Sequence, residues 1–237
     1  MKVGLFTGGK LHHHMKRCCV FVALVILISV SRAQTLALAP VAEFPPFRVI
    51  QGNLDSDGLP TSGAKLCLLK PADSCYQMPS NSGYSSGSVV FDYGINPHSK
   101  RLPLKGGGSI ILFSAQFSGG GSGTLDSLAI LRYESSGKIV NLLPFVGVTN
   151  QSDQAMWHAP QVSNYPILVT ADFNWMDGEA HFAKHFYTVS AYRFDDQKGQ
   201  YIKAFSYRTS KKYAGLDEVD QVNVLSLERE DILRRLR

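Results

Sequence analysis

The sequence predicts an all-β fold, an antiparallel β-sandwich or a partly open barrel that carries a short C-terminal α-helix. Three observations lead to this class. Runs of strand length alternate apolar and polar residues, turns rich in glycine and serine separate them, and almost no helical pattern precedes residue 226. The sequence has no repeat at the period of about 40–50 residues that propeller blades require, so we exclude a propeller.

The clearest strand pattern lies in the second half of the chain. Residues 109–117 alternate between apolar and polar side chains. Residues 183–194 and 200–208 form the best hairpin, because aromatic side chains flank a polar turn that ends at Gly199. The predicted strands are residues 47–51, 64–69, 88–93, 109–117, 125–134, 138–146, 167–175, 183–194 and 200–208.

The other segments are predicted as one helix and several loops. Residues 227–236 have acidic residues in the first turn and arginines in the last, as the helix dipole favours, and Ser226 is placed to act as the N-cap. The apolar stripe of this helix is narrow, so we expect it to pack on the edge of a sheet. Segments 94–108 and 149–165 are predicted as an irregular segment and a long loop.

Residues 1–33 are predicted to be a signal peptide whose translation starts at Met15. A basic start is followed by the apolar run 18–30, and small residues precede a cleavage site after Ala33. An apolar run of about a dozen residues is shorter than the roughly 20 that a membrane span needs, and a retained N-terminal anchor is the alternative. Residues 34–62 are then a lead-in segment, and 63–237 a single β-rich domain.

The charge of the chain depends on whether this leader is counted. The full chain has 24 Lys and Arg against 19 Asp and Glu, but five of the basic residues and none of the acidic ones precede Gln34. The mature chain therefore has no net charge, whereas a nucleic-acid partner would need a clustered basic excess. We expect a periplasmic or secreted protein with no nucleic-acid partner, no membrane span after leader removal and no cofactor.

Cys67 and Cys75 are the two cysteines that remain after the leader, and they lie close together in LCLLKPADSCY. An exported protein meets an oxidising compartment, in which such a pair is expected to form a disulfide across a short hairpin or loop. A metal pair is the alternative, but further cysteines or well-spaced histidines are lacking.

Glu179, His181 and His185 form the first candidate site, in GEAHFAKH. These residue types suit a metal ion, yet on a strand the two histidines are roughly 13 Å apart, at about 3.3 Å per residue. One ion holds its ligands about 2 Å from its centre, so a flat strand cannot present both. A hydrogen-bonded structural pair is the main interpretation. A shared metal after a bend in the strand, or a ligand-binding or catalytic role, are the alternatives.

Two further sites are weaker. Asp55 and Asp57, before Gly58, have the spacing that starts a calcium loop, but Ala64 stands where such a loop needs its last carboxylate. An Asx-rich turn is therefore preferred over a metal site. Trp157 and His158, in the predicted loop 149–165, are candidates for ligand contact. A tryptophan that covers the core edge is the alternative there.

One block of residues carries a resemblance to known proteins. It covers about 40 residues and is similar to uncharacterised exported bacterial proteins, through GEAHFAKH at 178–185, Tyr187-x-Val189, Tyr192-Arg193, Tyr201 and Thr209-x-Lys211-Lys212-Tyr213. It also resembles the periplasmic inhibitors of invertebrate-type lysozymes, in which a loop beside a strand like YTVSAYR enters the lysozyme cleft. In this chain HFAKHF replaces the short Ser/Gly-rich inhibitory loop of those proteins.

These observations predict an exported, non-enzymatic binding domain for a protein or glycan partner at the cell envelope. No serine lies in a nucleophile elbow, and no glycine-rich phosphate loop leads from a strand into a helix. The alternatives are a metal-dependent hydrolase that uses Glu179, His181 and His185, and a structural module of an envelope assembly.

Overall fold

The computed structural model describes residues 41–71, 73–80, 91–118, 124–144, 147–150, 153–174, 176–180, 183–213 and 224–237. All of them belong to one compact unit, Leu38–Arg237. Its strands are β1 (Phe47–Ile50), β2 (Lys65–Leu68), β3 (Cys75–Gln77), β4 (Ile95–Pro103), β5 (Ser109–Ser118), β6 (Thr124–Tyr133), β7 (Ile139–Asn141), β8 (Gly147–Asn150), β9 (Gln154–Trp157), β10 (Ile167–Asn174), β11 (Phe186–Asp195) and β12 (Gln200–Arg208). Its helices are α1 (Val224–Leu227) and α2 (Arg229–Arg235).

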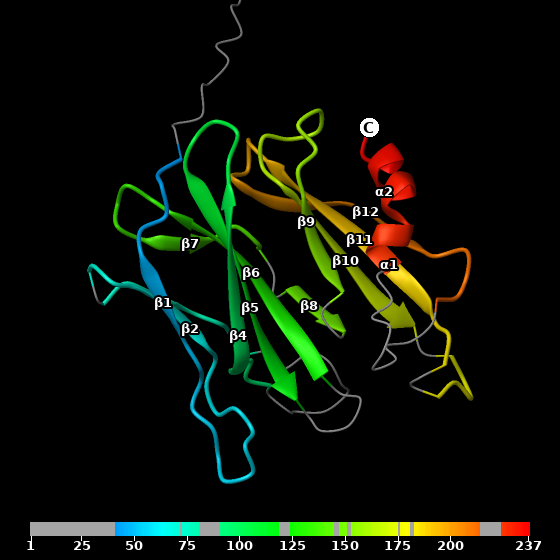
Figure 1. Ribbon diagram of the computed structural model, residues 1–237, viewed down its shortest axis with the longest axis horizontal. Coiled ribbons are helices and arrows are strands. Elements are labelled where there is room, and N and C mark those ends of the chain that lie inside the picture. The colour runs from blue at the N-terminus through cyan, green and yellow to red at the C-terminus, as the bar shows by residue number, and fades with distance from the viewer. Residues whose placement is uncertain are drawn as a thin grey trace, which may run out of the picture. The chain divides into compact units, whose positions relative to one another are not determined.

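These strands form three antiparallel sheets (Figure 1). The small sheet has the order β1-β2-β3, the middle sheet β4-β5-β6-β7, and the outer sheet β12-β11-β10-β9. The short strand β8 also pairs with β6, along Leu125 to Leu128. None of the three sheets closes into a barrel within the described part of the chain. The prediction of an antiparallel all-β fold with a short C-terminal helix is therefore confirmed.

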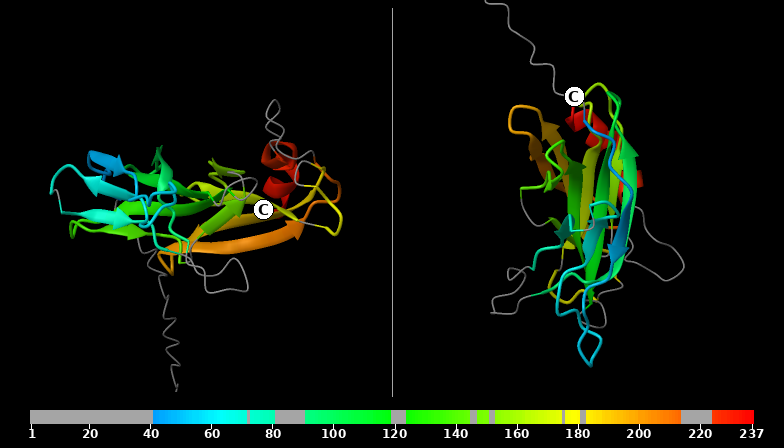
Figure 2. Two further views of the ribbon diagram at one scale, coloured as in Figure 1. Left: turned by 90° about the horizontal axis from the view of Figure 1, so that it is seen from below. Right: turned by 90° about the vertical axis from the view of Figure 1, so that its left-hand side faces the viewer.

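Three hydrophobic cores lie between the successive layers of the unit. In β5, Ile111 faces the small sheet, whereas its neighbour Ile110 faces the outer sheet and belongs to the same core as Leu168. On the other face of β10, Val169 shares the third core with Ile232 of α2. The small, middle and outer sheets follow one another from left to right in Figure 1, and the left panel of Figure 2 shows the helices on one face of the outer sheet.

The hairpin of β11 and β12 is confirmed, and its turn residues explain it. The Asp195 carboxylate accepts hydrogen bonds from the backbone N–H groups of Gln197 and Lys198, at 2.9 and 3.0 Å. Gly199 has φ +64°, a conformation that favours glycine, and its N–H donates to the Asp195 carbonyl at 2.8 Å. Tyr201 then starts β12 inside the core and donates its hydroxyl proton to the Pro166 carbonyl.

Two of the loop predictions are wrong. β4 lies in segment 94–108, and β9 lies in segment 149–165. β4 contains Pro97 and Pro103 and mostly polar residues, so its sequence shows no strand period, and pairing with β5 makes it a strand. β9 has four residues, too few for a period to be visible. Of the predicted strand at 88–93, residues 88–90 lie outside the described residues, and residues 91–93 belong to none of the strands.

The C-terminal helix differs from its prediction in two respects. Ser226 lies inside α1, and the N-cap of α2 is Glu228, which makes no side-chain capping bond. The helices pack on the face of the outer sheet rather than on its edge, because Leu225 and Ile232 are buried against Val169. No helix in the described ranges is both long and apolar enough to cross a membrane.

The small sheet contains the predicted disulfide. Cys67 and Cys75 face each other across β2 and β3 and are joined by a disulfide bond. The segment predicted as a lead-in, 34–62, contributes β1, which pairs with β2. Phe44 of the same segment is 1% exposed and belongs to the core that contains Ile111.

Candidate functional site

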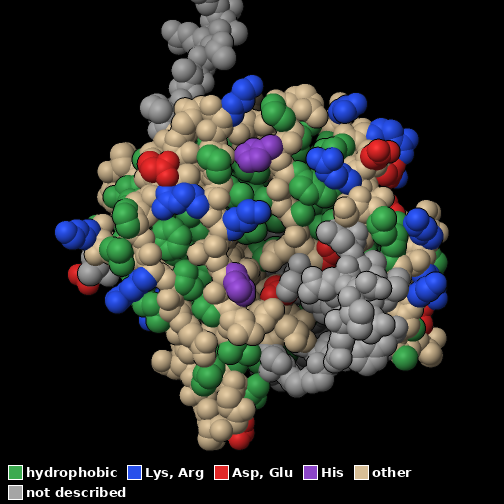
Figure 3. Space-filling view, in the orientation of Figure 1, with side chains coloured by type: hydrophobic (Ala, Val, Ile, Leu, Met, Phe, Trp, Pro, Cys, Tyr) green, Lys and Arg blue, Asp and Glu red, His purple; other side chains and the backbone are tan. Residues whose placement is uncertain are grey.

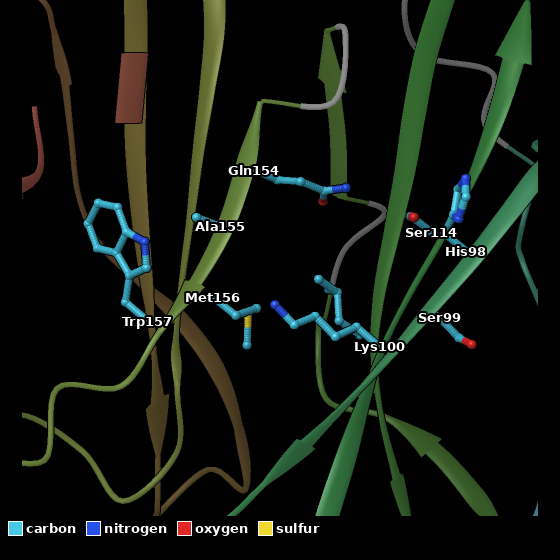
Figure 4. A pocket seen from close by; sticks show the side chains of 9 residues that line it. His98, Ser99, Lys100, Ser114, Gln154, Ala155, Met156 and Trp157 are labelled. Atoms are coloured by element: carbon cyan, nitrogen blue, oxygen red, sulfur yellow. The ribbon is translucent and has the colours of Figure 1, made fainter. Parts of the chain in front are cut away.

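A cleft of about 700 Å³ lies between the middle sheet and the outer sheet. Figure 4 shows β9 on one side of it and β4 and β5 on the other. Its lining residues are His98, Ser99, Lys100, Leu112, Ser114, Gln154, Ala155, Met156 and Trp157. The volume is within the range of about 300–1,000 Å³ that is usual for ligand sites.

Strand pairing explains why these side chains meet. His98 is opposite Ser114 and Lys100 is opposite Leu112, so all four side chains stand on the same face of the paired strands β4 and β5. Leu112 packs against the core that the middle and outer sheets share, as Met156 does from the other wall. The cleft therefore has an apolar floor below polar and basic walls.

The strand period of two decides which β9 side chains enter the cleft. Figure 4 shows Gln154 and Met156 directed toward the middle sheet, whereas the indole of Trp157 points away from the cleft. Trp157 packs against the third core, with the Arg229 guanidinium 5.6 Å from its ring centroid. His158 is exposed and does not line the cleft. Of the two residues proposed for ligand contact, Trp157 thus reaches only the rim.

The described residues that line the cleft include basic groups and no carboxylate. Lys100 and His98 are exposed, and no salt bridge of the described residues involves Lys100. Asp126 stands on the same face of the middle sheet but is 2% exposed and is not part of the lining. Figure 3 shows basic and histidine side chains over β4 to β6 on this face of the molecule. The cleft is therefore suited to a ligand with negative charge.

Gln154 adds an unsatisfied polar atom to the wall. Its Oε1 is buried and accepts no hydrogen bond from the protein. A buried acceptor without a donor destabilises the fold by about 1–3 kcal/mol, so such atoms usually have a partner in the functional state. Because this oxygen is buried, a donor in the cleft reaches it only after the Gln154 side chain turns.

Asp153 precedes Gln154 in sequence and points to the opposite side of β9. Burial, and then the charge of Asp172, raise the pKa of the Asp153 carboxyl to about 7, although the Val224 backbone N–H hydrogen-bonds to it. Its Oδ2 is buried and has no hydrogen-bond partner. Asp153 does not line the cleft, so we treat it as a pH-sensitive group of the third core.

Glu179 and His185 form the hydrogen-bonded pair that the sequence predicted. The Glu179 Oε2 atom lies 2.8 Å from His185 Nδ1, and the Lys212 ammonium binds the other carboxylate oxygen. The hydrogen bond from Lys212 and then that with His185 hold the pKa of Glu179 below its ordinary value. His185 is 1% exposed, and its backbone pairs with that of Tyr213. His181 lies outside the described residues.

Asp55 and Asp57, which are also candidate metal ligands, lie in a turn. Asp55 accepts hydrogen bonds from the N–H groups of Asp57 and Leu59 at 2.9 and 2.8 Å, and Gly58 has φ +78°. This is the geometry of an Asx turn. Within the described ranges, no three His, Cys, Asp or Glu side chains lie close enough to hold an ion together.

Comparison of the chain with family models, with curated proteins and with solved structures finds no match.

Proposed function

We propose that the protein is an exported binding domain and that its binding site is the cleft between β4 and β9. One observation carries this proposal: the cleft combines an apolar floor with the basic groups of His98 and Lys100. Such a mixture of apolar surface and a few polar groups is typical of ligand sites. The partner is a protein or a glycan of the cell envelope.

Export rests on two features. The sequence starts with a basic segment, an apolar run and small residues before Gln34, in the order of a signal peptide. The disulfide between Cys67 and Cys75 suits an oxidising compartment, because disulfides are rare where thiols are kept reduced. The two features together support a periplasmic or secreted location.

Binding is favoured over the metal-dependent hydrolase by the environment of Glu179. Lys212 occupies one of its oxygens, and His185 occupies the other. A metal ion at Glu179 would have to displace the Lys212 ammonium and expose an imidazole that is 1% exposed. Mass spectrometry on the purified protein tests this alternative. A stoichiometric metal that is lost in a Glu179→Gln variant would revive the hydrolase.

A capture experiment tests the binding function. The protein, immobilised after expression of the full chain, is exposed to a cell-envelope extract, beside a Lys100→Glu variant and a Lys203→Glu control on β12. Wild type and control are expected to retain the same envelope component, and the Lys100 variant to lose it. Equal retention by all three proteins, or retention by none, would contradict a partner in the cleft.

A further inference from the structure

The hydrogen-bonding phase of β9 determines where its backbone groups point. The N–H of Ala171 in β10 donates to the carbonyl of Asp153 at 2.9 Å, and these residues continue the register in which Gln154 is opposite Thr170. In an antiparallel ladder, hydrogen-bonded and non-hydrogen-bonded pairs alternate. Ala155 and Trp157 therefore bond to β10, whereas the N–H and C=O groups of Gln154 and Met156 point away from it.

These outward groups form an open sheet edge at the cleft. β9 is the last strand of the outer sheet and pairs only with β10 in the described part of the chain. Within that part, no backbone hydrogen bond of Gln154 or Met156 to another segment occurs. All four residues of β9 line the cleft although their side chains alternate, as expected if the strand also contributes its backbone edge. A free edge of this kind is a template for one more strand.

The opposite wall of the cleft selects the charge of such a strand. Side chains of an added strand that point to the middle sheet would meet Lys100, His98 and Ser114, which can all donate hydrogen bonds. Among the described residues, the lining has no acidic residue to compensate the charge of Lys100. Carboxylates at alternate positions of the added strand fit this wall.

From this edge and this wall we infer that the partner of the cleft is an extended, acidic polypeptide segment, which adds to the outer sheet as a strand beside β9. This inference rests on the proposed binding function and specifies its ligand. Main-chain hydrogen bonds to Gln154 and Met156 supply the alignment, and carboxylates facing Lys100 and His98 supply the selectivity. A glycan, a second copy of the chain or another segment of the same chain are the competing occupants.

Hydrogen exchange on the free protein examines the edge first. The amides of Gln154 and Met156 are expected to exchange rapidly, and those of Ala155 and Trp157 slowly, because only the second pair bonds to β10. Slow exchange at Gln154 and Met156 in the isolated monomer would show that another segment of the chain already pairs with the edge. That result would overturn the inference and leave the capture experiment unaffected.

A library of ten-residue peptides displayed on phage then identifies ligands. The enriched peptides are expected to carry Asp or Glu at alternate positions and to lack proline in their centre. A synthetic copy of an enriched peptide is tested with N-methyl groups on one or the other alternate set of amides. One set should abolish binding and the other should leave it unchanged, because a paired strand turns only alternate amides toward its neighbour.

Three variants assign the ligand to the edge and the wall. Met156→Pro removes one outward N–H together with the Met156 side chain, so it is compared with a Met156→Ala reference and should bind the synthetic peptide about tenfold or more weakly than that reference. Lys100→Gln should weaken the peptide about tenfold and reduce its salt dependence. Lys203→Gln on β12 is the control and should change nothing. Failure to enrich peptides, or affinity that survives both N-methylated sets, would overturn strand addition.

A galacturonic acid tetrasaccharide distinguishes failure of the acidic-peptide inference from failure of the proposed binding function. If it binds the wild type and loses affinity in Lys100→Gln, while no peptide binds, the acidic-peptide inference is overturned and the cleft remains a binding site. If the envelope extract also yields no partner that depends on Lys100, the binding function itself fails.

Discussion

The two sheet edges that flank the cleft are built in opposite ways. β4 has Pro97 and Pro103 near its ends and the basic run His98 to Arg101 between them, whereas β9 is Gln-Ala-Met-Trp, without a proline or a charge. The register of β4 places Pro103 where the N–H would point away from β5, since Leu104, one residue beyond it, bonds inward to Gly108. Pro97 lies in the irregular pairing between Ile95 and His98, where a proline is tolerated. Proline and positive charge on an edge are the usual means of preventing edge-to-edge association.

The edge at β4 is therefore protected against pairing with another strand, whereas the edge at β9 is open among the described residues. Arg101 also binds Glu43 and the Phe44 carbonyl, so that the segment before β1 lies against β4. No comparable contact covers the outward groups of Gln154 and Met156 among the described residues. An exposed edge increases the risk of aggregation. The lack of protection at β9 is explained if this edge binds a partner.

The largest expected effect separates the two sides of β9. Ala155→Pro removes an N–H that bonds to β10 and is expected to lower the free energy of unfolding by about 3 kcal/mol or more. Met156→Pro removes an outward N–H and also the side chain that packs against the core of Leu168. Relative to Met156→Ala, which loses the same packing and keeps the N–H, it should cost less than about 1 kcal/mol. Urea unfolding of both variants checks this, and equal losses would show that the assigned phase of β9 is wrong.

The next effect concerns the acid at the start of β9. The pKa of Asp153 in the folded state is raised to about 7. The contribution of this carboxyl to the free energy of unfolding is therefore present at low pH and is lost as the pH rises toward and through 7. Between pH 5 and pH 8 this loss amounts to about 2–3 kcal/mol, and Asp153→Asn should abolish it. Thermal or urea unfolding across this range provides the measurement. A wild type and a variant with parallel pH profiles would contradict the raised pKa.

A smaller effect is expected when the protection of β4 is removed. Replacing Pro97 and Pro103 by threonine restores an outward N–H at position 103 and an N–H at the irregular pairing of position 97. The double variant should change the free energy of unfolding by less than about 1 kcal/mol. The variant is expected to self-associate at lower concentration than the wild type in light scattering. Met156→Lys on β9 should act in the opposite direction, so identical scattering by all three proteins would remove the contrast between the edges.

The smallest effect is expected away from both edges, at Glu179. Its pKa is lowered chiefly by Lys212, so the contribution of this carboxylate is present at neutral pH and is lost as the pH falls below the ordinary range of a glutamate. Glu179→Gln should therefore lower stability slightly at pH 7 and less at acid pH, without altering the peptide affinity of the cleft. A large change in that affinity would connect the two regions.

The strands that the sequence predicts and the strands that it does not predict differ in what determines their conformation. β10, β11 and β12 alternate regularly or end in a turn with Gly199, so local pattern was enough to locate them. β4 and β9 gain their strand conformation from pairing with β5 and β10, which no local pattern expresses. Since the cleft lies between these two strands, its walls were missed for the same reason.

Individual site residues repeat this lesson. The closeness of Glu179 and His185 was visible because both lie in one short segment. Trp157 was chosen for its chemistry, but the alternation of β9 directs its ring away, and the neighbours Gln154 and Met156 reach the cleft. Their contribution depends on a strand of four residues that the sequence did not reveal.

The middle sheet is buried on both faces, and this has a consequence for how substitutions combine. Ile110 and Ile111 are adjacent in the chain but lie in different cores, whereas Ile110 and Leu168 are far apart and share one. In double-mutant cycles, truncations at 110 and 111 should add within about 0.5 kcal/mol, and those at 110 and 168 should not. Covariation would then link positions of β5 that face the same core, and these positions are two residues apart.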